Sequence, residues 1–376
     1  MFYLIKETTK GKARRGEIQT DHGVIPTPIF MPVGTAGTVK AVDHTISASK
    51  IKAPIILGNT YHLFLRPGNS TMDKAGGLHA FMNWQGALLT DSGGYQVFSL
   101  SGIRDLEADG VVFKSHLDGS RHKFTPENVI ETQRILGSDI MMVLDECLPY
   151  PATESNVRES LELTHRWASS SIQAYHNSTD RYGHRQFLFG ITQGGVYPAW
   201  RKKSVEVLSE MEFHGMAIGG LSVGEPRELM YEITDVSTDL LPRSKPRYLM
   251  GVGTPADILE CVARGIDMFD CVIPTRNARN GMIFTQNGII NIRNARWKNA
   301  FESADPEFDS DLCRNHSMAY IHHLFKSGEI LGLQLATTHN LTFYLRLMEQ
   351  IRMHIDADTF SSWYPGMVKR VKQRIT

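Results

Sequence analysis

Short apolar runs recur along the chain as far as residue 274, and most are followed by a longer stretch with helical periodicity. The runs are continuously apolar rather than alternating, which is typical of parallel strands that are buried on both faces. Each run ends in glycine or polar residues. In chain order the predicted strands are 27–34, 54–60, 87–94, 139–146, 187–195, 215–220, 247–253 and 268–274.

The stretches between these strands carry helix signals. The clearest is 125–137, where Thr125 is placed as the N-cap and Pro126 takes the first helical position. Further helices are predicted at 156–172, 198–211, 226–240 and 255–264. Strand and helix alternating eight times predict an α/β fold of the closed (β/α)8, TIM-type barrel class rather than an open sheet.

Two segments do not fit the repeat. Residues 98–124 contain an Asp-Gly turn between apolar stretches, which predicts a hairpin inserted after the third strand. After the eighth strand, Asn287-Gly288 predicts a second hairpin.

An acidic, irregular piece at 302–311 follows, and then helices are predicted at 314–327 and 341–356. We therefore divide the chain into a catalytic barrel with inserted hairpins, residues 1–280, and a remainder, residues 281–376. The remainder comprises barrel closure and a C-terminal helical appendage.

Composition narrows the class of protein. The 40 Lys and Arg residues balance 40 Asp and Glu residues, and 41% of residues are hydrophobic, which excludes a disordered chain and an overall basic nucleic-acid coat.

The four cysteines, Cys147, Cys261, Cys271 and Cys313, form no close C-x-x-C pair, as expected in a reducing compartment. Lys6 interrupts the apolar N-terminus, and no apolar run approaches the ~18–20 residues of a membrane helix. A cytoplasmic protein is predicted.

A barrel places its working residues at the C-terminal ends of its strands. Those ends read Asn59, Asp91, Asp145, Gln193, Gly220 and Asp270. One Asp after a strand is usually a turn or helix cap, but three carboxylates with an Asn and a Gln predict a site. Two carboxylates facing each other across a sugar suit a retaining glycosidic-bond exchange, and a further carboxylate with an amide and Gly-Gly N–H groups suits guanine.

Residues 275–300 form a basic segment with no Asp or Glu. Its cations are Arg276, Arg279, Arg293, Arg296 and Lys298. Because the segment directly follows the eighth strand, it predicts a phosphate-binding rim beside the barrel mouth rather than a solvated surface turn.

Four long motifs resemble those of bacterial tRNA-guanine transglycosylases: TDSGGYQVFSL (90–100), ITQGG (191–195), IGGLSVGE (218–225) and MFDCVIPTRNARNG (268–281). The resemblance runs from KARRG (12–16) to about residue 355. That family, the queuine tRNA-ribosyltransferases, exchanges the wobble guanine of certain tRNAs for a 7-deazaguanine on the route to queuosine.

The resemblance implies roles for individual residues. Asp270 matches the nucleophile and Asp91 the acid/base, while Tyr95 and Met250 match residues that sandwich the base. Asn59 would support the two catalytic carboxylates. The implied base-binding set is Asp91, Ser92, Gly93, Gly94, Tyr95, Asp145, Gln193, Gly220, Leu221 and Met250. The implied RNA-binding set is Gly251, Val252, Gly253, Thr254, Pro255, Ala256, Asp257, Thr275, Arg276, Asn277, Ala278 and Arg279.

The implied reaction is a double displacement on a tRNA anticodon loop, with guanine leaving and a 7-deazaguanine base entering. It requires neither ATP nor a redox cofactor, in keeping with the lack of a phosphate-loop motif. Cys147 beside Asp145, together with Val223, suggests 7-aminomethyl-7-deazaguanine as the entering base. The family typically works as a homodimer, and residues 319–325 resemble part of that interface.

The chain departs from the family at its structural zinc site, which normally has C-x-C-x-x-C and a later His. Phe308 and Ser310 replace two of the cysteines, leaving Cys313 and His339 in a degenerate zinc-site region, 308–339. A structural zinc needs four ligands; Asp309, Asp311 or His316 could substitute for the lost cysteines, but the oxygen ligands of the aspartates would bind zinc more weakly. We therefore expect the protein to fold without zinc, with Phe308 filling the space by apolar packing.

Two other functions stay open at this point. A retaining glycoside or nucleoside hydrolase on a barrel would share the carboxylates but leave the basic segment unexplained. A non-catalytic, tRNA-binding accessory subunit is disfavoured because both Asp91 and Asp270 are present.

Overall fold

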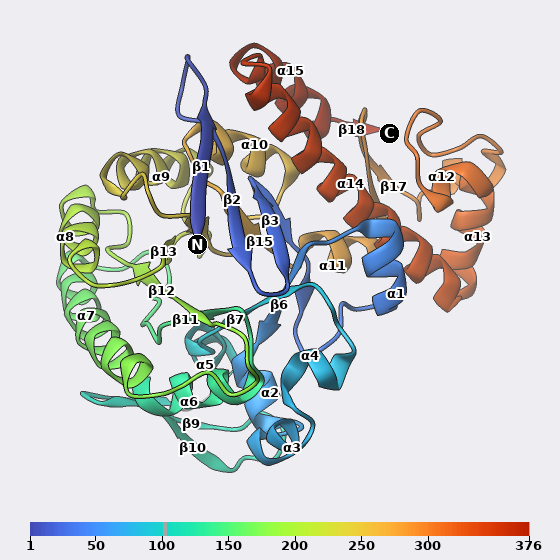
Figure 1. Ribbon diagram of the computed structural model, residues 1–376. Coiled ribbons are helices and arrows are strands. Elements are labelled where there is room, and N and C mark those ends of the chain that lie inside the picture. The colour runs from blue at the N-terminus through green and yellow to red at the C-terminus, as the bar shows by residue number, and fades with distance from the viewer. Residues whose placement is uncertain (101–103, 376) are drawn as a thin grey trace.

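The computed structural model describes residues 1–100 and 104–375, and its centre is a parallel barrel ringed by helices (Figure 1). The predicted fold class is confirmed. The barrel segments are hydrogen-bonded in the order β4-β15-β14-β13-β12-β11-β7-β6-β5. Their bounds are β4 (Ile29–Met31), β5 (Val33–Gly34), β6 (Ile55–Asn59), β7 (Ala87–Asp91), β11 (Ile140–Met142), β12 (Phe187–Thr192), β13 (Gly215–Ile218), β14 (Arg247–Leu249) and β15 (Met268–Asp270).

The barrel closes through a strand that is broken at Pro32. The first predicted strand, 27–34, is divided into β4, which pairs with β15, and β5, which pairs with β6. Proline has no backbone N–H, so it cannot continue a ladder, although its carbonyl still accepts the Leu57 N–H at 2.9 Å. Nine segments therefore fill eight strand positions.

The predicted helices lie around the barrel with ends shifted by a few residues. They are α6 (Pro126–Leu136), α7 (Glu154–His176), α8 (Pro198–Ser209), α9 (Arg227–Leu240) and α10 (Pro255–Ala263). Thr125 caps α6 as predicted, since its side chain accepts the Asn128 N–H at 3.3 Å. Shorter elements complete the ring: α1 (His44–Ile46), η1 (Ser47–Ile51), α2 (Thr60–Leu65), α3 (Asn69–Lys74), α4 (Gly77–Met82), α5 (Gly94–Leu100) and α11 (Ile273–Arg279).

An antiparallel sheet that the sequence pattern did not reveal covers the end of the barrel where the strands begin (Figure 1). It consists of β1 (Phe2–Glu7), β2 (Arg14–Thr20) and β3 (Gly23–Thr27). Arg14 is fully buried and donates to both carboxylate oxygens of Asp267, at 2.9 and 2.8 Å. This bidentate pair ties the sheet to the start of β15.

The inserted hairpin is present as β9 (Gly110–Lys114) and β10 (Arg121–Phe124), with β8 (Arg104–Glu107) as a third strand. Residues 101–103 of the predicted insertion lie outside the described residues.

The second hairpin consists of β16 (Met282–Thr285) and β17 (Gly288–Asn291), and β18 (Arg374–Ile375) pairs with β17. Thr285 pairs with Gly288, so its loop is Gln286-Asn287 rather than the predicted Asn287-Gly288.

The C-terminal helices differ in extent from the prediction. They are η2 (Ala295–Asn299), α12 (Asp311–Asn315), α13 (Met318–Ser327), α14 (Ile330–Asp356) and α15 (Phe360–Lys372), so α14 begins at Ile330 rather than at residue 341. Tyr344 of α14 donates to the Gly253 carbonyl at 2.6 Å, and Arg352 donates to the Pro28 carbonyl at 2.7 Å. These bonds hold α14 against the barrel, and the predicted division at residue 280 stays a prediction.

No helix in the described part of the chain combines the length and the apolar character needed to span a bilayer.

Candidate active site

Asp91 ends β7 and is held by donors from the neighbouring strand end. Asn59 Nδ2 donates to Asp91 Oδ2 at 2.6 Å, and the Thr60 N–H donates to Oδ1 at 3.0 Å. Burial raises the pKa of Asp91 to about 7; the Thr60 N–H opposes this shift and the Asp270 carboxylate adds to it. Asp91 is therefore suited to both give and take a proton near neutral pH.

Asp270 ends β15 and is held on one oxygen. The Tyr248 hydroxyl donates to Oδ1 at 2.6 Å, and the Gly251 N–H donates to the same oxygen at 2.9 Å. Burial raises the pKa of Asp270, whereas these two hydrogen bonds lower it. Among the residues that the structure describes, none donates a hydrogen bond to Oδ2. This arrangement fixes the carboxylate while leaving one oxygen free to attack an electrophile.

Asp145 follows β11 and faces Gln193, which follows β12. Gln193 Nε2 donates to Asp145 Oδ2 at 2.7 Å, and Ser92 Oγ lies 3.5 Å from Oδ1. Burial raises the pKa of Asp145 to about 6, and the Gln193 hydrogen bond opposes the shift. The structure thus brings together three of the predicted base-binding residues in one buried hydrogen-bonded group.

Asp145 and Gln193 pass so close to the backbone at two positions, Gly94 and Gly220, that these positions require glycine. A Cβ atom at Gly94 would lie 2.7 Å from the Asp145 carbonyl oxygen. At Gly220, where φ is +65°, a Cβ atom would lie 2.3 Å from Gln193 Oε1. A larger residue at Gly94 would displace the backbone of Asp145, and one at Gly220 would displace the side chain of Gln193.

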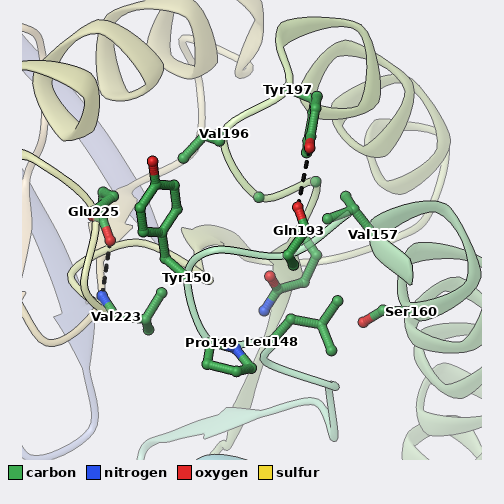
Figure 2. Close-up of a pocket in the computed structure, with 14 residues that line it drawn as sticks. Leu148, Pro149, Tyr150, Val157, Ser160, Gln193, Val196, Tyr197, Val223 and Glu225 are labelled. Atoms are coloured by element: carbon green, nitrogen blue, oxygen red, sulfur yellow. Dashed lines mark hydrogen bonds between the residues drawn. The ribbon is translucent and has the colours of Figure 1, made fainter. Parts of the chain in front are cut away.

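Gln193 and Gly220 also line a pocket, together with residues of the segments after β11, β12 and β13 and of helix α7 (Figure 2). Glu225 holds the segment after β13: its carboxylate accepts the Val223 N–H at 3.0 Å and also the Ser222 N–H. This fixes the backbone on either side of Val223, which lines the pocket. Nothing in the sequence pattern predicted this contact of Glu225.

The remaining predicted base contacts lie at the same end of the barrel, because each follows a parallel strand. Tyr95 in α5 is 54% exposed, Leu221 is buried, and Met250 is partly buried directly after β14. The exposed ring of Tyr95 is available for stacking. Its predicted pairing with Met250 around a base stays a prediction.

The first predicted RNA-binding segment, 251–257, is largely buried. Gly251 and Thr254 reach the surface, whereas the other members, Val252, Gly253, Pro255, Ala256 and Asp257, are buried. Thr254 caps α10 by accepting the Asp257 N–H at 3.2 Å. The observed contacts of this segment therefore start a helix and position Asp270, and RNA binding by it stays a prediction.

The second predicted RNA-binding segment, 275–279, presents charge outward. Arg276 is exposed, Asn277 and Arg279 are partly buried, and Thr275 and Ala278 are buried. Arg279 donates to the Thr275 carbonyl at 2.9 Å within α11. Arg276 is thus the member of this segment best placed to meet a phosphate.

Sequence reasoning missed the donors that hold the two catalytic candidates. Tyr248 lies within buried strand β14, where a hydroxyl needs a hydrogen-bond partner, and that requirement could have identified it. Thr60 acts through its backbone N–H, which no side-chain pattern reveals.

Replacing Tyr248 with Phe removes one of the two donors to Asp270 and keeps the ring packing. Hydrogen bonds to charged groups contribute about 1.5–3 kcal/mol, so we expect roughly 10- to 100-fold slower turnover. Losing a donor to the carboxylate raises its pKa, so the acid limb of the pH–rate profile should move to higher pH. Steady-state kinetics across pH check this, and an unchanged acid limb would contradict the assigned contact.

Comparison with known proteins agrees with this geometry. The family model described as queuine tRNA-ribosyltransferase matches residues 9–373. This chain belongs to the queuine tRNA-ribosyltransferase family. Proteins named queuine tRNA-ribosyltransferase are 55% identical to it in Caldanaerobacter subterraneus (98% of this chain, 97% of the relative) and 52% identical in Aquifex aeolicus (100% and 99%). Another in Thermoanaerobacter pseudethanolicus is 55% identical (95% and 94%).

In this member of the queuine tRNA-ribosyltransferase family, the four positions of the degenerate zinc site lie together. Ser310 Oγ is 2.8 Å from His339 Nδ1, Cys313 Sγ is 3.7 Å from the same nitrogen, and the Phe308 ring packs edge-on to His339. His339 Nε2 faces the Phe284 carbonyl at 2.7 Å, so it carries the proton and Nδ1 accepts from Ser310. A phenyl ring and a neutral hydroxyl do not fit a tetrahedral zinc site.

Proposed function

We propose that this chain is a tRNA-guanine transglycosylase that replaces the wobble guanine of an anticodon with 7-aminomethyl-7-deazaguanine. The observation that carries the proposal is the pair of carboxylates that lie at one barrel mouth in different surroundings. Asp270 has a free oxygen and Asp91 a pKa of about 7. The relatives are named as tRNA-ribosyltransferases, which supports base exchange on tRNA, and the base in their names is queuine.

In the proposed reaction, Asp270 Oδ2 attacks C1′ of the guanosine while the bond from C1′ to guanine breaks and Asp91 protonates the departing base. The product is a ribosyl ester on Asp270. The entering base loses a proton to Asp91 and attacks C1′, which breaks the ester. Two inversions give overall retention, and the protein ends in its starting protonation state.

Base recognition is proposed for the group around Asp145. A guanine edge offers two adjacent N–H donors, which one carboxylate accepts together. Gln193, now bonded to Asp145, would turn its amide to the carbonyl of the base, with N–H groups at Gly220 and Leu221 as further donors. The hydrogen bond between Gln193 and Asp145 thus holds the empty pocket in shape.

The 7-aminomethyl substituent is the feature that we propose this pocket selects. Cys147 is buried, and burial raises the pKa of its thiol to about 12, so it stays a small neutral group. Val223 narrows the adjoining pocket (Figure 2). Competition between guanine, 7-aminomethyl-7-deazaguanine and the bulkier queuine for tRNA tests this choice, and preference for queuine would contradict it.

We propose the tRNA anticodon loop as the macromolecular substrate and the cytoplasm as its location. The basic segment 275–300 supports this, because its cations directly follow the strand of Asp270. An anticodon loop is single-stranded, which keeps the cost of flipping a base out low.

A homodimer is proposed through α13 and its surroundings. Within 319–325, Tyr320 is 40% exposed, while Ile321, Leu324 and Phe325 are buried. Phe301, next to α13, is 77% exposed, and Ile330 at the start of α14 is 69% exposed. Such exposed apolar side chains are typical of protein contact surfaces.

The C-terminal region is proposed to fold without zinc, through the contacts of Ser310 and His339. Burial lowers the pKa of His339 to about 4, so its ring stays neutral and keeps both hydrogen bonds. The double substitution Phe308→Cys and Ser310→Cys should create a four-ligand site with Cys313 and His339. We expect Co²⁺ to give a thiolate charge-transfer band in this variant and none in the unaltered protein; such a band in the unaltered protein would contradict the proposal.

The deciding experiment is incorporation of labelled guanine into unmodified tRNA that carries a wobble guanine. Exchange that survives a chelator supports the transglycosylase assignment and chemistry that needs no metal. A hydrolase would release guanine and leave an abasic site, and an accessory subunit would bind tRNA without exchange.

A further inference from the structure

Three histidines from distant parts of the chain meet at the other end of the barrel. His22 lies in the turn between β2 and β3, His79 in α4, and His184 in the loop before β12. One ring nitrogen of each lies within 4.8 Å of one ring nitrogen of the other two. His184 precedes its barrel strand, whereas the catalytic candidates follow theirs, so this cluster is remote from the active site.

Each ring donates one N–H to an oxygen and keeps one nitrogen with a free lone pair. His22 Nδ1 faces Asp139 Oδ1 at 2.8 Å, and His79 Nδ1 faces the Trp84 carbonyl at 3.0 Å. His184 Nε2 faces the Gly137 carbonyl at 2.8 Å. Carbonyl and carboxylate oxygens can only accept hydrogen bonds, so the ring nitrogen that faces each oxygen carries the proton. The unprotonated nitrogens, each with a free lone pair, are therefore His22 Nε2, His79 Nε2 and His184 Nδ1. Metal-binding histidines are oriented in this way.

The free nitrogen of His79 lacks a partner. His79 Nε2 is buried and makes no hydrogen bond, although Asp139 Oδ2 lies 3.2 Å away. A neutral His79 therefore turns a lone pair toward a carboxylate oxygen, and the two repel each other unless a cation lies near both.

Asp139 is a fully buried carboxylate at the centre of the cluster. Besides His22, it accepts the Leu88 N–H on Oδ2 at 2.8 Å. The cluster thus combines three imidazoles with one buried carboxylate.

The chain segments that carry the cluster are also held together independently. Arg185, next to His184, pairs with Asp21, next to His22, with Nη2 to Oδ1 at 2.6 Å. The hairpin turn and the loop before β12 are therefore held close together before any ion arrives.

We infer that His22, His79 and His184 bind a divalent transition-metal ion of the Zn²⁺ type beside the buried Asp139 carboxylate. Imidazole nitrogen suits zinc, nickel, cobalt and copper, and three histidines leave a fourth position for water. The bound ion would fasten the N-terminal sheet to α4 and to the barrel end.

Binding requires one ring to move. The His22 and His79 rings are stacked with centroids 3.7 Å apart and an interplanar angle of 16°. Since a lone pair lies in the plane of its ring, two stacked rings cannot both point at one ion. His22 is the ring that turns, because it sits on a hairpin turn and its side chain is 23% exposed.

The test is titration of the full chain, after treatment with a chelator, with Co²⁺ and then with Zn²⁺. Absorption spectra report the binding of Co²⁺, and the melting temperature reports the effect of Zn²⁺. We expect one Co²⁺ per chain with ligand-field bands but no thiolate charge-transfer band, and a higher melting temperature with Zn²⁺. His22→Gln, His79→Gln and His184→Gln should each weaken binding at least ~10-fold, and Asp139→Asn by about 10- to 100-fold.

The matched control is His176→Gln. His176 is an exposed residue near the end of α7, and its ring lies 3.6 Å from Glu212. The His176→Gln variant should bind Co²⁺ and Zn²⁺ as the unaltered protein does. His22→Gln keeps the experiment decisive if a buried variant fails to fold, because His22 lies on an exposed turn. Binding that survives all three histidine changes, a thiolate band, or no stoichiometric binding would each overturn the inference.

Discussion

Replacing Asp270 with Ala is expected to slow guanine exchange by on the order of 10⁴-fold or more, because the change removes the carboxylate that is proposed to form the ribosyl ester. The structure gives Asp270 one oxygen fixed by Tyr248 and Gly251 and one oxygen free. Asp270→Asn is the sharper variant, since it keeps the shape but lacks a nucleophilic carboxylate. Labelled guanine incorporation measures the loss, and denaturing electrophoresis shows whether a covalent tRNA–protein species still forms.

Both Asp270 variants should retain tRNA binding in a gel-shift assay, since the exposed cations of 275–300 are untouched. Glu162→Gln, on the exposed face of α7, is the matched control for removing one carboxylate and should exchange normally. Exchange within 10-fold of the unaltered protein in Asp270→Asn would contradict the assigned nucleophile.

Replacing Asp91 with Asn is expected to slow exchange by about 10²- to 10⁴-fold, the usual contribution of a positioned general acid/base. Asn cannot carry the proton that guanine needs on leaving and that the entering base gives up. In the unaltered protein, burial raises the pKa of Asp91 to about 7, so both protonation states are populated near neutral pH. Its exchange rate should therefore peak near neutrality and fall on both sides.

The Asp91→Asn variant should lose the limb of the pH–rate profile that belongs to Asp91. Measuring kcat/KM between about pH 5 and 9 for both proteins checks this. A variant that is slow yet keeps the same two limbs would place the proton transfer on another group.

The barrel could be predicted because its strands are buried on both faces and therefore read as unbroken apolar runs. The N-terminal sheet could not, because strand β1 is largely exposed and its residues show no clean alternation of buried and exposed positions. Its attachment depends on the Arg14–Asp267 pair, whose members are distant in sequence.

The strand-end rule placed Asp91, Asp145 and Asp270 at one mouth, but it could not supply their hydrogen-bond partners. Tyr248 reaches Asp270 because β14 pairs with β15 in a register that sets Tyr248 opposite Met268. Register between neighbouring strands is a tertiary property. The histidine cluster was missed for the same reason, since no short spacing links its members.

The broken strand at Pro32 has a consequence for how the protein is made. Asp270 lies opposite Met31, so the residue with the free carboxylate oxygen takes its place only when β15 meets β4, near the start of the chain. Arg352 then secures that seam from α14. A growing polypeptide on the ribosome therefore holds an incomplete cylinder until β15, at residues 268–270, has emerged and can pair with β4. A chain truncated after α11 would contain Asp91 and Asp270 but lack the Arg352 contact that secures this seam, so we expect it to be inert.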